Sequence, residues 1–211
     1  MARVPGVYIS GAVEGLLDDA VARRLMEIAG GRPGPIHIKY GKGQLLQKLS
    51  GYNSAAEFTP WLVLVDLDHD DDCAPAFCTR WLPAPANHMC FRVAVREVET
   101  WLLADRERLA AFLSVPASAI PAECETLDDP KGTMIKLAAR SRRGDIRDEM
   151  VPRPGSGRDE GPAYTGRLIE FVSHSGQAWR PEVAAARCDS LARSLRRLEA
   201  LVRNHAHNAL S

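Results

Sequence analysis

The stretch that decides the fold is WLVLVDLDHDDDC, residues 61–73. It opens with an apolar run and then carries five aspartates between positions 66 and 72. A continuous apolar run bounded by turn signals is typical of a strand that is buried on both faces of a parallel sheet. Carboxylates crowded at the end of such a strand repel one another, so the pattern predicts a positive charge that neutralises them.

The segments on either side predict alternating strands and helices. Strands are expected at residues 7–13, 35–40, 61–68 and 88–95, and helices at 16–28, about 44–49, 74–82 and 98–113. This alternation is typical of an open parallel sheet covered by helices, so we predict an α/β fold with about four strands. Ligands of such sheets bind beyond the carboxyl ends of the strands.

After residue 114 the pattern changes. Helices are expected at 133–141, 163–174 and 181–203, while the polar, glycine- and proline-containing segment 142–162 predicts a mobile surface loop. We therefore divide the chain into an α/β core, residues 1–114, and a helical C-terminal extension, residues 115–211, packed on that core as one unit.

The last predicted helix is amphipathic. Its apolar stripe and its basic face are defined by spacing. The stripe comprises Cys188, Leu191, Leu195, Leu198 and Val202, and the exposed basic face comprises Arg193, Arg196, Arg197 and Arg203.

Composition narrows the classes of partner. The formal net charge is zero, with 27 basic and 27 acidic residues, so a nucleic-acid site would have to be a local patch. No apolar run approaches the ~18 residues that a membrane helix needs. The five cysteines form no CxxC pair, which favours reduced thiols and a cytoplasmic protein.

Acidic residues follow three of the predicted strands. Glu14 follows the first strand, Asp66 and Asp68 end the third, and Glu97 and Glu99 follow the fourth. Two residues apart on a strand, Asp66 and Asp68 are expected to point the same way. Oxygen ligands of this kind suit Mg²⁺ or Mn²⁺.

Simpler interpretations remain open for each of these acids. The DxD pair is also found in solvated acidic turns, and Glu14 or Glu97 would serve as a helix-capping acid. Residues 70–72 are all aspartate and are expected to cap the next helix. His69 lies inside the acidic run without a zinc-ligand spacing to Cys73 or Cys78.

Three of these stretches carry a resemblance. VEGLLDDAVARRL, LVLVDLDHDDDC and VAVREVETWLLAD resemble the TOPRIM-like superfamily, and within it a bacterial family called domain of unknown function 4276. The later DDPKG, GPAYTGRLIEFV and WRPEVAAARCDSLARSLRRL are similar to the same family, so the likeness covers nearly the whole chain.

The resemblance implies a TOPRIM fold and a divalent-metal site. It assigns the first acid to Glu14 and the DxD to Asp66 and Asp68, and it matches Glu99 to an acid of nuclease-like relatives; Glu97 matches less well. Metal-assisted phosphodiester cleavage would follow, with Mg²⁺ or Mn²⁺ as cofactor and Lys131, in DDPKG, as a basic group near the phosphate. Asp129 and Pro130 of that motif equally make an ordinary helix start.

Two functions are expected from this family. The first is a nuclease acting on DNA or RNA, in phage defence. The second is a non-catalytic module that binds a partner such as a separately encoded ATPase; the chain itself has no GxxxxGK[ST] motif for ATP. A phosphatase or a sugar transferase with a DxD is a weaker alternative, because in haloacid-dehalogenase-like phosphatases the DxD follows the first strand.

Overall fold

A four-stranded sheet forms the centre of the molecule. The structure is a computed structural model that describes residues 6–71, 73–174 and 176–208. The strands are all parallel and are arranged in the order β2-β1-β3-β4, which confirms the α/β fold class. Their bounds are Tyr8–Val13 for β1, Arg32–Ile38 for β2, Trp61–Asp66 for β3 and Met89–Ala94 for β4.

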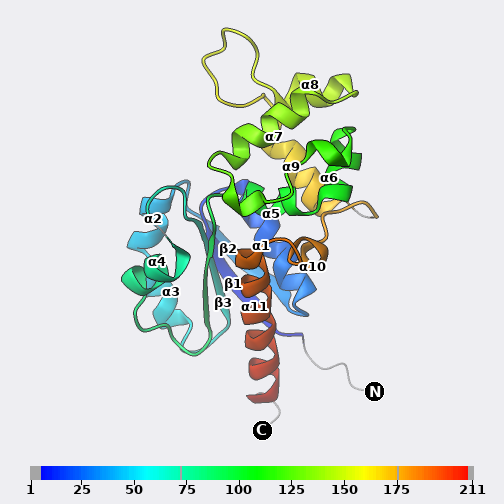
Figure 1. Ribbon diagram of the computed structural model, residues 1–211. Helices are drawn as coiled ribbons and strands as arrows, with labels where there is room; N and C mark the ends of the chain where they lie inside the picture. Colours follow the sequence, from blue (N-terminus) through cyan, green and yellow to red (C-terminus); the bar gives the residue numbers. More distant parts are fainter. Residues whose placement is uncertain (1–5, 72, 175, 209–211) are drawn as a thin grey trace.

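Helices cover both faces of this sheet (Figure 1). One face carries α2, α3 and α4, while α1 and α11 lie on the other. The bounds of the core helices are Leu16–Ile28 for α1, Lys42–Gln47 for α2, Leu49–Ala55 for α3, Ala74–Trp81 for α4 and Val98–Ala104 for α5.

The two cores explain the apolar run in β3. Leu62 and Leu64 point into the core that the sheet shares with α1 and α5, whereas Val63 and Val65 point into the core shared with α2, α3 and α4. Both faces of β3 are therefore buried, and its sequence is apolar throughout rather than alternating.

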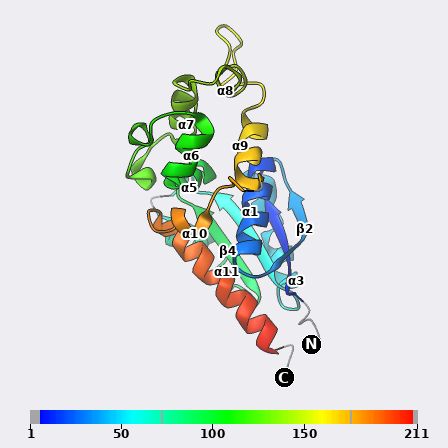
Figure 2. The ribbon, with the colours of Figure 1, turned by 90° about the vertical axis from the view of Figure 1, so that its right-hand side faces the viewer.

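The remaining helices pack on the core. Helices α6 to α9 form a lobe at one end of the sheet, whereas α11 runs along the sheet (Figures 1 and 2). In this extension α9 contacts α1, and α11 contacts β4. The bounds are Arg106–Leu113 for α6, Pro130–Ala139 for α7, Gly144–Met150 for α8, Tyr164–Ser173 for α9, Pro181–Ala184 for α10 and Asp189–Asn208 for α11. No helix among the described residues is both long and apolar enough to cross a membrane.

The expected helix 181–203 is in fact two helices. The chain between α10 and α11 turns. Glu125, from the distant short 3-10 helix Cys124–Thr126, accepts hydrogen bonds from the backbone N–H groups of Asp189 and Ser190 at 2.9 and 2.8 Å. A carboxylate at the first N–H groups of a helix satisfies otherwise unpaired donors and the helix dipole. The start of α11 is thus set by a tertiary contact.

Two further expectations were wrong for similar reasons. The helix expected at 98–113 breaks at Asp105, a fully buried side chain that binds the guanidinium of Arg180 at 2.5 and 3.0 Å. The segment 142–162 is not all surface loop, because it contains α8, whose Ile146 and Met150 are buried in the main core.

β2 also differs from its expected position, beginning at Arg32 and ending at Ile38. It includes Pro33 and Pro35, which lack the N–H that a central strand would need; β2 is at the edge of the sheet, where proline is tolerated. The region around 44–49 forms two short helices, α2 and α3, instead of one.

The amphipathic prediction for the last helix is largely confirmed. The apolar stripe of Cys188, Leu191, Leu195, Leu198 and Val202 is buried in the main core. On the basic face, Arg193, Arg196 and Arg203 are exposed, but Arg197 is half-buried and donates a hydrogen bond to the carbonyl of Met89. Arg197 therefore anchors α11 to β4.

Candidate metal and phosphate site

The carboxyl ends of the strands bring the predicted acids together. Asp66 is the last residue of β3, and the charges of Asp18, Glu99, Glu14 and Asp68 all act on it. Burial is the first cause that raises the pKa of Asp66 well above its usual value, and the four neighbouring carboxylates raise it further. We call Glu14, Asp18, Asp66, Asp68 and Glu99 the acid cluster.

Asp66 has the least compensated position in the acid cluster. Its Oδ1 atom is buried and has no hydrogen-bond partner among the described residues, and the same is true of Asp18 Oδ1. A buried acceptor without a donor is costly, and more so when it carries charge. The buried side of the acid cluster therefore holds carboxylate oxygens that no donor among the described residues satisfies.

Glu14 is not a helix cap. Its Oε1 accepts a hydrogen bond from the backbone N–H of Asp66 at 3.0 Å, which ties the end of β1 to β3. The N-cap of α1 is Gly15, whose N–H donates to Asp18 Oδ2 at 2.9 Å. Burial raises the pKa of Glu14 to about 7, against the lowering effect of the Asp66 N–H and of Lys42.

Asp68 is not on the strand, contrary to the expectation that it would lie beside Asp66. β3 ends at Asp66, and Asp68 has a left-handed φ of 50°. The strand alternation that would make the two side chains parallel therefore does not extend to Asp68. Asp68 is about half exposed. Its Oδ2 lies 2.5 Å from Lys42 Nζ, which also contacts Asp70 Oδ2 at 2.7 Å.

Lys42 brings a positive charge to this edge of the sheet. Its side chain is only 12% exposed, and its ammonium also lies 3.4 Å from the carbonyl of Leu67. Burial alone would lower the pKa of Lys42, but the hydrogen bonds to Asp68 and Asp70 outweigh it and raise that pKa. Lys42 stays charged and neutralises the exposed side of the cluster.

Glu97 and Glu99 stand at the start of α5. Glu97 is its N-cap residue, and its Oε2 accepts from the backbone N–H of Lys131 at 3.0 Å. Glu99 is buried, and its Oε1 accepts from the Tyr164 hydroxyl at 3.1 Å. Burial, and then the charge of Glu97, raise the pKa of Glu99 to about 7.

Lys131 lies near these two glutamates at the start of α7. Its ammonium pairs with Glu160 at 2.5 Å and lies over the Tyr164 ring, 5.4 Å from the centroid. Its charge lowers the pKa of Glu97 and of Glu99. The ordinary helix start is also present, because Asp129 caps α7 through the N–H of Gly132.

Left-handed residues gather around the same edge. Four described residues other than glycine have a positive φ, and three of them follow the carboxyl ends of strands: Tyr40 after β2, Asp68 after β3 and Arg96 after β4. Asp68 and Arg96 are linked, since Asp68 N donates to Arg96 O at 2.9 Å and Arg96 Nη1 donates to Asp68 O at 2.8 Å. Such strain is commonest at functional sites.

Asp70 and Asp71, which were expected to cap the next helix, contact basic side chains. Asp70 binds Lys42, Asp71 pairs with Arg80 of α4, and position 72 lies outside the described residues. The N-cap of α4 is Cys73, without a side-chain hydrogen bond. His69 contacts Arg96, with 3.0 Å between Nδ1 and Nη1.

Sequence reasoning missed Asp18 and Lys42. Asp18 lies one helical turn after Glu14, so the spacing in EGLLD would have placed both at the start of one helix. Lys42 had a weaker signal, its place just after β2. Nothing in the local sequence indicates that its side chain reaches the aspartates of another loop.

The donor chemistry of the cluster fits a hard divalent cation. All its ligating atoms are carboxylate oxygens, which Mg²⁺ and Mn²⁺ prefer, and Asp66 Oδ1 accepts no hydrogen bond from the described residues. Glu14 and Asp68, however, are engaged with the Asp66 N–H and with Lys42. Across the described ranges, no three His, Cys, Asp or Glu side chains stand as ligands around one point.

Comparisons with known proteins add no relatives: no family model, no curated protein and no solved structure matches this chain.

Proposed function

We propose that this protein is a divalent-metal-dependent nuclease of TOPRIM type. The observation that carries the proposal is Asp66 Oδ1, buried without a hydrogen-bond donor among the described residues and surrounded by four other carboxylates. A divalent cation offsets the repulsion that raises the pKa of Asp66. The resemblance of residues 14, 66, 68 and 99 to TOPRIM acids supports the same proposal.

The position of each residue suggests its role in the proposed reaction. Glu14, Asp66 and Asp68 would hold Mg²⁺ or Mn²⁺, which when bound polarises a phosphoryl oxygen and activates water. Glu99, held by Tyr164, would orient the attacking group or a second ion. Lys131, at the same end of the sheet, would neutralise charge on the phosphate in the transition state. Nucleic acid, DNA or RNA, is the proposed substrate, in phage defence.

A second function is favoured by a different observation. Asp68 is already neutralised by Lys42, and Glu14 is already bound to the backbone. A module that binds a partner protein, such as a separately encoded ATPase, would need no ion at this edge. This second candidate predicts no metal affinity.

Titration calorimetry with Mn²⁺ separates the two. Wild type should bind, and Asp66→Ala/Asp68→Ala should not, while Asp70→Ala, which removes a neighbouring carboxylate that also binds Lys42, serves as the matched control. Cleavage of single-stranded DNA and RNA with Mg²⁺ or Mn²⁺ is then measured for the same proteins. Equal Mn²⁺ affinity of wild type and the double variant would contradict the metal site.

A further inference from the structure

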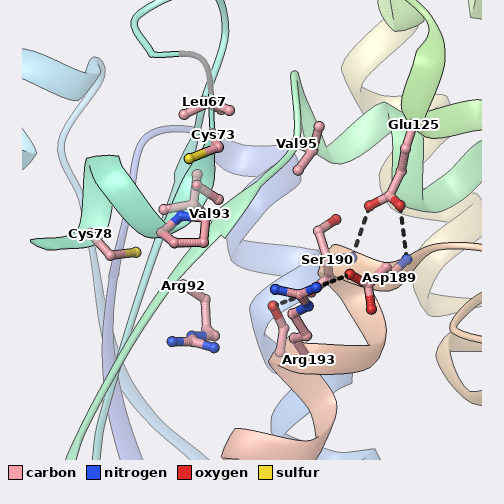
Figure 3. A pocket seen from close by; sticks show the side chains of 13 residues that line it. Leu67, Cys73, Cys78, Arg92, Val93, Val95, Glu125, Asp189, Ser190 and Arg193 are labelled. Carbon is pink, nitrogen blue, oxygen red and sulfur yellow. Dashed lines mark hydrogen bonds and ion pairs between the residues drawn. The ribbon is translucent and has the colours of Figure 1, made fainter.

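A groove lies along the open edge of the sheet, between α4 and α11 (Figure 3). We call it the β4 groove; it has a volume of about 590 Å³ and is lined by Leu67, Ala74, Cys78, Arg92, Val93 and Arg193, among others. In Figure 3, Cys78 faces it from α4 and Arg193 from α11, with β4 between them. This volume is within the range of small-ligand sites, roughly 300–1,000 Å³.

The formal charge of the β4 groove is zero, because Glu125 and Asp189 balance Arg92 and Arg193. Its two acids are used inside the fold: Glu125 caps α11, and Asp189 pairs with Arg193 at 2.6 Å. Arg92 donates to the carbonyl of Phe91 but forms no ion pair with any residue that the structure describes. The groove therefore offers a guanidinium beside apolar walls, which fits an anion with an apolar body.

Two residues that line the β4 groove adjoin residues of the candidate site in the chain, although no member of the acid cluster lines the groove itself. Leu67, which lines it, stands between Asp66 and Asp68, and Val95, which also lines it, precedes Arg96. Arg96 in turn donates to the carbonyl of Asp68. A chain molecule in the groove would have to extend past Leu67 to approach the residues proposed for phosphodiester cleavage.

A peptide strand does not fit this edge. Trp61 N donates to His88 O and Leu67 N to Ala94 O, so the odd-numbered residues of β4 turn their backbone groups outward. Arg197 already binds the carbonyl of Met89, and Arg92 that of Phe91. An added strand needs such carbonyls as acceptors, so side chains of this protein protect the edge.

We infer that the β4 groove binds one or two nucleotides of a single strand, with a phosphate at Arg92 and a base against Leu67, Ala74 and Val93. This inference rests on the proposed nuclease function and names its substrate class. A duplex does not enter a groove of this volume without strand separation. The binding is tolerant of sequence, because apolar contacts with a base face distinguish bases weakly.

Two thiols allow a direct test. Among the cysteines, Cys73 is exposed and Cys78 half-buried, both in the groove wall, whereas Cys90, Cys124 and Cys188 are buried. Alkylation of the full-length protein is followed by mass spectrometry in EDTA, which prevents cleavage. A short 5′-phosphorylated oligothymidine should slow alkylation of Cys73 and Cys78 several-fold, while inorganic phosphate and a duplex of equal length should not.

Affinity is measured in parallel by fluorescence anisotropy. Arg92→Glu should weaken oligothymidine binding at least tenfold, and Arg140→Glu, an equal charge change at an exposed residue outside the groove, should change it less than threefold. The inference is overturned by absence of binding, by binding without thiol protection, by equal protection from phosphate or duplex, or by equal affinity of the Arg92→Glu variant.

The outcomes also separate this inference from the proposed function. Mn²⁺ binding without thiol protection would overturn the groove assignment and leave the metal site intact. Thiol protection in a protein that binds no Mn²⁺ would leave a single-strand groove and overturn the nuclease proposal.

Discussion

The hydroxyl of Tyr164 donates a hydrogen bond to Glu99 across 3.1 Å, and both side chains are buried. The contact joins α9 of the helical extension to α5 of the core, 65 residues away. It places a donor from the C-terminal half of the chain beside Glu99, so the extension contributes to the candidate site.

Tyr164→Phe should destabilise the protein by about 1–3 kcal/mol at pH 8, because a buried carboxylate loses its donor. The loss should be smaller at pH 5.5, where Glu99, whose pKa is about 7, is already protonated. Urea unfolding at the two pH values measures both. In the Glu99→Gln background the effect of Tyr164→Phe should no longer depend on pH; a persistent dependence would show that another group titrates.

Trp101 shows how α11 depends on the core. Its side chain is fully buried, and its indole N–H donates to Ser190 Oγ at 2.8 Å. Trp101→Ala should cost about 3–5 kcal/mol through the cavity left behind. Ser190→Ala, which leaves the indole N–H without its acceptor, should cost about 1–3 kcal/mol. Thermal unfolding compares the two, and an unchanged midpoint for Trp101→Ala would contradict its place in the core.

The metal-free protein should lose stability as pH rises from about 4.5 to 7. Burial raises the pKa of Glu14 and Glu99 to about 7 from 4.5, so the folded state holds protons that the unfolded chain has already released. Stability falls with pH wherever the folded state binds more protons, here by on the order of 1–3 kcal/mol for each of the two groups. Urea unfolding in EDTA from pH 4.5 to 8 measures the slope.

Glu99→Gln provides the control for that profile. It removes one of the two raised groups, so the decline between pH 4.5 and 7 should become shallower, and folding itself should be retained. Under the proposed function the same variant should also reduce nuclease activity. A profile identical to wild type would mean that Glu99 is already ionised at pH 5.

The sequence predicted the parts of the fold that depend on local pattern. The apolar run of β3 and the helical spacing of α1 are found where expected, because burial on both faces or on one stripe fixes which residues must be apolar. The break before α11 and the break at Asp105 were missed. At each of them a carboxylate contacts a residue that is far away in the sequence.

The candidate site also has features that the sequence predicts and features that depend on tertiary contacts. Parallel topology alone placed Glu14, Asp66 and Glu99 at one edge. The left-handed backbone at Asp68 and the reach of Lys42 across to it depend on loops whose conformation is set by tertiary contacts, such as the paired hydrogen bonds between Asp68 and Arg96. No periodicity in the sequence reports such contacts.

Substitution of the exposed arginines of α11 tests whether a nucleic-acid strand also contacts the protein outside the β4 groove. Arg193 and Arg196 are exposed, whereas Arg197 anchors the helix to Met89 and is left unchanged. Arg193→Ala/Arg196→Ala should weaken single-strand binding and reduce its log–log salt slope by roughly 0.7 for each phosphate that is no longer neutralised. Anisotropy at several salt concentrations measures this. If affinity and slope both equal those of wild type, this face of α11 is only a solvated helix surface.

Substitution of Lys42 tests whether its ammonium group competes with a metal ion for Asp68. Its ammonium occupies the space beside Asp68 and Asp70, so a divalent ion approaching Asp68 meets a positive charge. Lys42→Met should raise Mn²⁺ affinity about tenfold or more, equivalent to about 1.4 kcal/mol, while lowering the stability of the metal-free protein. Lys42→Arg, which keeps the charge, should leave the affinity within about threefold of wild type. Calorimetric titration of the three proteins gives both affinity and stoichiometry. Lower Mn²⁺ affinity in Lys42→Met would mean that Lys42 holds Asp68 in its binding position and does not compete with the ion.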